Sequence, residues 1–201
     1  MELQAQEPPK RLEARHLSRA VLLPHRNEIL THMPKNGVVC EVGTRQGHFA
    51  RKIVDVTQPT KLHLIDRDWS RFERASFAND LKSGRIVTHD IDSSEGLLSF
   101  DDGTFDWIYI DADHSYTSVK KDIEAAAPKL KKGGYIIFND YIGWTRQGGR
   151  YGVIRAVNEF CVANDWRVEF LALSKGGYND IVLREADAAA DAGAAANGVV
   201  S

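Results

Sequence analysis

Residues 37–47 read Gly-Val-Val-Cys-Glu-Val-Gly-Thr-Arg-Gln-Gly. The first seven form a short, mostly apolar run that is closed by Gly43. The run predicts a buried β-strand, and a helical pattern over residues 48–56 follows it directly. Glycines after a strand allow a tight turn and let a ligand approach the backbone where the next helix begins. This strand–turn–helix unit indicates an α/β fold with a ligand site at the turn.

Apolar runs and helical patterns alternate through the rest of the chain. Six further strands are predicted at 61–65, 85–87, 106–110, 135–138, 166–173 and 180–183. Helices are predicted at 68–81, 93–100, 115–130 (ending at Lys131–Gly134) and 151–163, after a helical lead-in over 16–31 that is interrupted near Pro24. This order predicts a three-layer α/β/α sandwich around a mostly parallel seven-stranded sheet, with one antiparallel strand near the C-terminus.

Composition excludes several classes of protein. The 201 residues suffice for one domain, and 26 Lys plus Arg against 28 Asp plus Glu give a formal net charge of -2. A protein that coats nucleic acid or binds a membrane surface needs an excess of basic residues. No apolar run has the length of a membrane-spanning helix, and residues 1–15 lack the apolar region of a secretory signal. We therefore expect a cytoplasmic protein with no nucleic-acid or membrane partner.

The two ends differ from the middle of the chain. Residues 1–12 are rich in Gln, Glu, Pro and Lys, which predicts a flexible arm, and the alanine-rich residues 186–201 are predicted to be a disordered tail. The domain is expected to span residues 13–185. Cys40 lies within an apolar run and is expected to be a reduced core thiol, which fits a reducing compartment.

Acidic residues at strand ends are the next informative feature, because ligands of parallel α/β sheets bind at the carboxyl ends of the strands. Asp66 ends the second strand about 23 residues after Gly43, where a carboxylate can accept hydrogen bonds from both hydroxyls of a ribose. Capping of the next helix is the alternative role, and Asp68 could equally supply that cap. Together, the glycine turn and Asp66 predict a nucleoside-containing ligand across the first two strands.

The turn also separates two kinds of nucleoside. A dinucleotide site needs the pattern G-x-G-x-x-G so that backbone amides can hold a pyrophosphate. Here Arg45 stands in the loop, and a carboxylate at Glu41 would repel pyrophosphate but suits a cationic amino-acid group. The turn therefore favours S-adenosylmethionine over NAD.

Four motifs, in this order, carry a resemblance to a known family: EVGTRQG at 41–47, LID at 64–66, IDADHSY at 110–116 and LKKGGYIIFNDY at 130–141. They resemble the class I S-adenosylmethionine-dependent methyltransferases, over roughly residues 35–185, which implies a Rossmann-like fold. The second half is similar to the small O-methyltransferases that use a divalent metal, including the catechol, caffeoyl-CoA and macrolide-sugar types. Many members of the family have a glycine where this chain has Arg45.

The resemblance implies a role for each matching residue. Its cofactor-binding residues would be Glu41, Gly43, Thr44, Gln46, Gly47, Asp66 at the ribose, Asp92 and Ser93 near the adenine, and Asp111. Its metal ligands would be Asp111, Asn139 and Asp140, the last two reordered relative to the usual pair. Asp111 and Asp140 end neighbouring strands ~5 Å apart, and oxygen ligands suit Mg²⁺. Alternatively, the two carboxylates cap helices or bind the amine of the cofactor.

His114 is the candidate catalytic residue. It follows Asp111 by three positions, beside the place where a methyl acceptor must sit, and a neutral imidazole there could take the proton of an acceptor hydroxyl. The resembling enzymes have His or Lys at this position. The alternative is a hydrogen bond to Asp111 or Asp113 without a catalytic role. The loop 143–151, which includes Arg146 and Arg150, is predicted to be a lid on the substrate side.

These features favour methyl transfer from S-adenosylmethionine to a hydroxyl of a small-molecule acceptor, with Mg²⁺ as an optional second cofactor. The alternatives are a cofactor-binding protein without catalysis, an N- or protein methyltransferase, and a nucleotide-linked oxidoreductase. Glu41 and the missing third glycine disfavour the oxidoreductase. A homodimer is compatible with the sequence, but no pattern indicates its interface.

Overall fold

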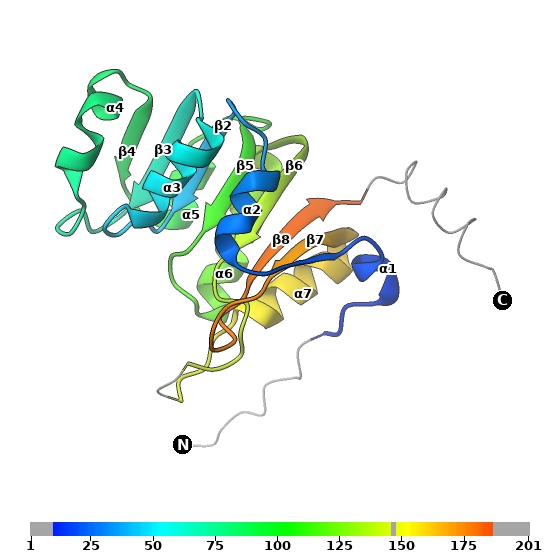
Figure 1. Cartoon of the computed structure of the whole chain (residues 1–201). Coiled ribbons are helices and arrows are strands. Elements are labelled where there is room, and N and C mark those ends of the chain that lie inside the picture. The colour runs from blue at the N-terminus through cyan, green and yellow to red at the C-terminus, as the bar shows by residue number, and fades with distance from the viewer. Residues whose placement is uncertain (1–9, 146–147, 187–201) are drawn as a thin grey trace.

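The computed structural model describes residues 10–145 and 148–186 (Figure 1). Most of the predicted arm at 1–12 and tail at 186–201 lies outside the described residues, as does Arg146. Within the described ranges, no helix has both the length and the apolar character needed to cross a membrane.

An eight-stranded sheet runs through the molecule in the order β1-β7-β8-β6-β5-β2-β3-β4. The strands are β1 (Val21–Leu23), β2 (Val38–Val42), β3 (Lys61–Asp66), β4 (Ile86–Asp90), β5 (Phe105–Ile110), β6 (Leu130–Phe138), β7 (Trp166–Ala172) and β8 (Asp180–Glu185). Neighbouring strands are parallel except at β8, which runs antiparallel to both β6 and β7. The predicted sheet, mostly parallel with one antiparallel strand near the C-terminus, is confirmed.

Helices cover both faces of this sheet (Figure 1). On one face lie α2 (Arg26–His32), α3 (His48–Thr57), η1 (Arg74–Phe77) and α4 (Ala78–Lys82). On the other lie α5 (Ser93–Leu98), α6 (Tyr116–Ala126) and α7 (Val153–Asn164), while the short α1 (Ala14–Leu17) packs beside β7. Each helix layer encloses its own apolar core against the sheet. Cys40 and Cys161 are buried and unpaired, as expected for Cys40. The three-layer sandwich is therefore confirmed.

The segment 16–31, predicted as an interrupted helix, instead contains β1 and most of α2. The three apolar residues before Pro24 pair with Phe170–Ala172 at the edge of β7, so the sheet has eight strands instead of seven. A short segment takes up strand conformation when a neighbouring edge offers hydrogen bonds, and this tertiary effect leaves no period in the sequence.

Two predicted helices are also shorter than expected. Asp66 and Asp68 accept hydrogen bonds from the backbone N–H groups of Asp68 and Ser70, and such local bonds compete with a helix, so helical structure starts only at Arg74. The helix predicted at 115–130 ends as α6 at Ala126, and a 3-10 turn that contains Pro128 (η2, Ala127–Lys129) follows it. The Lys131–Gly134 stretch then belongs to β6, not to a helix end.

Candidate cofactor and acceptor site

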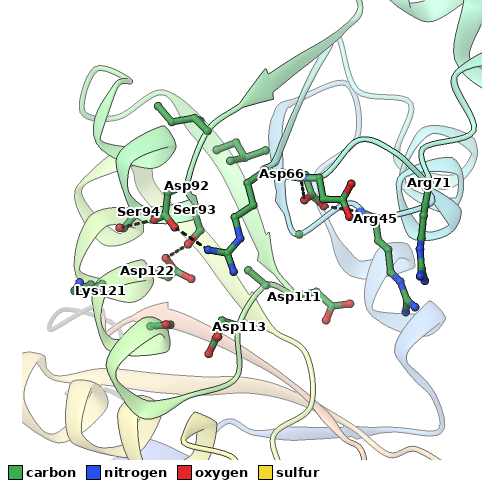
Figure 2. A pocket seen from close by; sticks show the side chains of 17 residues that line it. Arg45, Asp66, Arg71, Asp92, Ser93, Ser94, Asp111, Asp113, Lys121 and Asp122 are labelled. Atoms are coloured by element: carbon green, nitrogen blue, oxygen red, sulfur yellow. Dashed lines mark hydrogen bonds and ion pairs between the residues drawn. The ribbon is translucent and has the colours of Figure 1, made fainter.

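A cleft of about 490 Å³ opens at the carboxyl ends of β2, β3, β4 and β5 (Figure 2). One side of α6 completes its wall through Ser118, Lys121 and Asp122. A cleft of this size lies within the range of small-ligand sites, and its position at the strand ends agrees with the rule for open α/β sheets.

Five of the predicted cofactor-binding residues line this cleft: Gly43, Asp66, Asp92, Ser93 and Asp111. The other four do not belong to the lining, and their cofactor roles stay predictions: Glu41, Thr44, Gln46 and Gly47. Gly47 has a packing reason of its own, because a Cβ there would lie 2.8 Å from the rings of both Phe72 and Phe77.

Asp66 links β3 to the glycine turn. Its Oδ2 accepts a hydrogen bond from the backbone N–H of Arg45 (2.7 Å), and its Oδ1 accepts one from Asp68 (2.9 Å). A carboxylate has about four acceptor positions, so both oxygens keep capacity for ribose hydroxyls. The two alternative roles of Asp66, local cap and ribose ligand, are therefore compatible. Arg45 itself takes a left-handed conformation with a φ of 51°, uncommon for a residue other than glycine.

Asp92 is the N-cap of α5 and lies in the cleft away from Arg45. Its Oδ1 accepts hydrogen bonds from the backbone N–H (3.3 Å) and hydroxyl (3.2 Å) of Ser94, and its Oδ2 lies 3.9 Å from the Arg67 guanidinium. The neighbouring Ser93 hydroxyl donates to Asp122 Oδ1 at 2.6 Å. The Asp92 carboxylate is thus engaged with α5 and Arg67.

His114 lies between two carboxylates. Its Nε2 is 3.6 Å from Asp111 Oδ1 and 3.8 Å from Asp140 Oδ2, and this buried nitrogen has no hydrogen-bond partner in the described part of the chain. The imidazole stacks on Tyr151, with ring centroids 4.6 Å apart, and the backbone oxygen of His114 accepts a hydrogen bond from Gly152 (2.7 Å). The structure therefore brings Asp111, His114 and Asp140 together.

A buried polar network beside this group was not predicted. The Tyr109 hydroxyl donates to Asp180 Oδ2 (3.0 Å) and accepts from Arg26 (3.1 Å) and from the amide of Asn139 (3.3 Å). That amide also donates to Asp180 Oδ1 at 3.2 Å. The one sequence signal for the network is Asp180, an acidic residue directly before the apolar run 181–183.

Burial raises the pKa of several carboxyl groups here. The pKa of Asp111 rises to about 8, mainly by burial, with the charge of Arg26 opposing the rise and those of Asp140 and Asp180 adding to it. Burial also raises the pKa of Asp180 to about 6 and lifts that of Asp140. For Glu41, which is fully buried, burial raises the pKa well above its ordinary value. The site thus concentrates acidic groups that a bound cation would favour in their charged form.

The predicted metal ligands differ in their surroundings. Asp111 and Asp140 both approach His114, whereas the amide nitrogen of Asn139 points into the Tyr109 network. Across residues 10–145 and 148–186, no group of three or more His, Cys, Asp or Glu side chains is arranged as a metal site. Mg²⁺ usually keeps several waters and binds one or two carboxylates, so the pair Asp111 and Asp140 fits such an ion.

The loop after β6 contributes Tyr151 to the site. Trp144 and Arg150 form an isolated β-bridge, and the guanidinium of Arg150 lies 5.0 Å from the centre of the Trp144 ring. Trp144 is 56% exposed, while Tyr151 covers one face of His114. The lid itself remains a prediction.

The sheet order with its antiparallel β8, the glycine turn and the acidic strand end are together typical of the class I methyltransferase fold. The chain belongs to the methyltransferase domain family, whose sequence model matches residues 40–141. Membership implies S-adenosylmethionine as the methyl donor. A search of curated proteins gives no match.

Solved structures share this fold at low sequence identity. Precorrin-6y C5,15-methyltransferase from Geobacter metallireducens is 17% identical with a TM-score of 0.59, over 80% of this chain and 86% of that chain. Ribosomal protein L11 methylase from Lactobacillus delbrueckii subsp. bulgaricus is 18% identical with a TM-score of 0.57, over 80% and 77%. A spermidine synthase in complex with the transition state analogue AdoDATO is 18% identical with a TM-score of 0.61, over 82% and 62%. Their names differ in substrate, so the shared fold does not specify the acceptor.

Proposed function

We propose that this methyltransferase transfers the methyl group to a hydroxyl of a small molecule, with His114 as the general base. One observation carries the proposal: the buried His114 Nε2 has no hydrogen-bond partner among the described residues, yet it lies within 4 Å of two carboxylates. Asp111 belongs both to this group and to the lining of the cleft. A methyl acceptor beside His114 would therefore lie next to the end of the bound cofactor that is nearest to Asp111.

The cleft supports the cofactor part of this proposal. Asp66 lies at the strand end where ribose hydroxyls are bound in nucleoside sites, with acceptor capacity left on both oxygens. The buried Glu41 and the partly exposed Asp111 place carboxyl groups near the glycine turn, and the sulfonium and ammonium groups of S-adenosylmethionine are cations that suit them. Among the solved structures of this fold, the spermidine synthase binds an analogue named AdoDATO.

Methyl transfer is an in-line displacement. The bond from sulfur to the methyl carbon breaks as the bond from the acceptor oxygen forms, so the products are a methyl ether and S-adenosylhomocysteine. His114 Nε2 takes the hydroxyl proton and becomes an imidazolium between Asp111 and Asp140, whose charges stabilise it. Tyr151 holds the ring by stacking, which keeps Nε2 in position for the proton.

The same carboxylates are the proposed holders of a divalent cation. Mg²⁺ bound by Asp111 and Asp140 would polarise the acceptor oxygen and lower the pKa of its hydroxyl.

A transfer assay tests the proposed function. Labelled S-adenosylmethionine is incubated with pooled phenols, sugars and hydroxy acids, and, in parallel, with pooled amines and a protein extract. We expect label in a methyl ether of the hydroxyl pool. Label confined to amines or protein would contradict the hydroxyl acceptor and indicate another class of acceptor. Failure of the protein to bind S-adenosylhomocysteine would contradict the proposed cofactor.

A further inference from the structure

Asp122, on α6, is a buried acid that the proposed chemistry does not use. Its side chain belongs to the lining of the cleft, yet the residue is only 1% exposed. The hydroxyl of Ser93 donates to Oδ1 at 2.6 Å, while Oδ2 has no hydrogen-bond partner in the described part of the chain. A buried polar atom left without a partner is destabilising, so this oxygen is a place where a ligand donor would be bound.

Acidic neighbours of Asp122 outweigh the basic one in their effect on its pKa. Burial raises the pKa of Asp122 to about 6, and the charges of Asp92 and Asp113 add to the rise, whereas the Ser93 hydrogen bond and the charge of Lys121 oppose it. The nearby Arg67 is directed to Asp92. The Oδ2 atom, without a hydrogen-bond partner among the described residues, therefore suits a binding site better than a core.

The location of Asp122 in the cleft indicates which part of the cofactor would contact it. Figure 2 shows Asp122 and Ser93 at one end of the cleft and Asp111 and Arg45 at the other. On the proposed function, the methyl group is transferred beside Asp111 and the ribose lies at Asp66. The base of the nucleoside then extends toward Asp122, past an apolar part of the lining that consists of Ile65, Ile91 and Ala112.

We propose that Asp122 determines specificity for the base: its Oδ2 accepts a hydrogen bond from the exocyclic amino group of the adenine. This inference rests on the proposed use of S-adenosylmethionine. Asp92, to which the family resemblance points, is less suited, because its carboxylate is engaged with Ser94 and Arg67. In a purine with an oxygen in place of this amino group, the 6-oxo oxygen would face Asp122 Oδ2. Both atoms are hydrogen-bond acceptors, so this purine would bind more weakly.

Calorimetric binding of S-adenosylhomocysteine and its 6-oxo analogue, S-inosylhomocysteine, tests this role. The unchanged protein should prefer the amino form by about tenfold or more, since the wrong base leaves a buried acceptor unpaired. In Asp122→Asn the amide can turn its N–H groups toward a 6-oxo group, so the preference should disappear or reverse. Asp113→Asn, with the same loss of charge in the same cleft, should keep the preference.

Stability of the ligand-free protein provides a second readout. Because Asp122→Asn removes a buried carboxyl that lacks a full set of partners, its thermal midpoint should equal or exceed that of the unchanged protein. A purely structural role would instead lower the midpoint and leave the ratio of the two affinities unchanged. If S-adenosylhomocysteine binds but Asp122→Asn keeps the original ratio, the inference about Asp122 is overturned while the proposed function stands. If S-adenosylhomocysteine does not bind, both are overturned.

Discussion

Gly43 and Asp111 meet backbone to backbone: a Cβ on Gly43 would lie 2.1 Å from the carbonyl oxygen of Asp111. The backbone N–H of Asp111 also donates to Val42, directly before the glycine. The glycine turn after β2 therefore packs directly against the end of β5, and the chain continues from there to His114. A change at Gly43 is expected to act on both halves of the site through this contact.

Gly43→Ala should lower the free energy of unfolding by about 3 kcal/mol or more, because it adds a backbone collision to the strain of a positive φ. Gly84→Ala is the matched control. Gly84 also has a positive φ (72°), but a Cβ there would meet nothing within 4 Å, so its cost should be only about 1 kcal/mol. Urea unfolding of both variants measures the difference, and equal costs would show that the contact with Asp111 is unimportant.

His114→Ala should lower kcat by ~10²–10⁴-fold, the usual contribution of a general base. Its affinity for S-adenosylhomocysteine should hardly change, because His114 is not among the residues that line the cleft proposed for the cofactor. His48→Ala, at an exposed histidine that begins α3, should leave kcat unchanged. A near-normal kcat for His114→Ala would assign the proton to another acceptor.

Treatment with EDTA separates the metal from the base. If Asp111 and Asp140 hold Mg²⁺, then EDTA should abolish methyl transfer, added Mg²⁺ should restore it, and binding of S-adenosylhomocysteine should persist. Asp140→Asn should raise the Mg²⁺ concentration needed for half-maximal rate. Full activity in EDTA would overturn the metal proposal and leave His114 and its carboxylates as the acceptor site.

Tyr109→Phe should lower the free energy of unfolding by roughly 1–3 kcal/mol, because it removes a hydroxyl that bonds Asp180, Arg26 and Asn139 inside the protein. Tyr135→Phe, on β6, is the comparison, because it removes the same hydroxyl from a ring that is only partly buried and packs against Arg184. Chemical unfolding at neutral pH measures both. Equal, small effects would mean that solvent replaces the Tyr109 hydroxyl.

The His63–His89 pair on β3 and β4 should make stability depend on pH. Burial, with the charges of His89 and Lys61, lowers the pKa of His63 to about 4 from 6.5. The unfolded chain therefore takes up a proton near pH 6.5 that the folded protein resists until about pH 4, so stability is present above pH 6.5 and is lost as pH falls through this window.

The loss should be about 1–2 kcal/mol, because the ring is partly exposed and solvent weakens the effect. In His63→Leu, this pH-dependent part should vanish. The raised pKa values of Asp122 and Asp180 act in the opposite direction over similar pH values, but they are common to both proteins and cancel in the comparison. Identical pH slopes for the two proteins would contradict the assignment to His63.

The sequence predicted the features that depend on short motifs at the ends of strands. The turn at Gly43, the acid at Asp66 and the grouping of Asp111, His114 and Asp140 follow from strand ends that a parallel sheet brings to one edge. Asp122 was missed because only its burial and its unpaired oxygen distinguish it from an ordinary helix surface residue. The bond between Arg26 and Tyr109 joins residues far apart in the chain, and no spacing rule foretells it.

The pairing of β1 with β7 has a consequence for the growing chain. Residues 21–23 leave the ribosome well before their strand partner, residues 170–172, has been made. The network around Tyr109 likewise contains both Arg26, next to β1, and Asp180, so it can form only after Asp180 has been made. During translation, the part of the sheet formed by β2 to β5 can therefore assemble first. The pairing of β1 with β7 and the contact of Arg26 with the Tyr109 network follow only after β7 and β8 have been made.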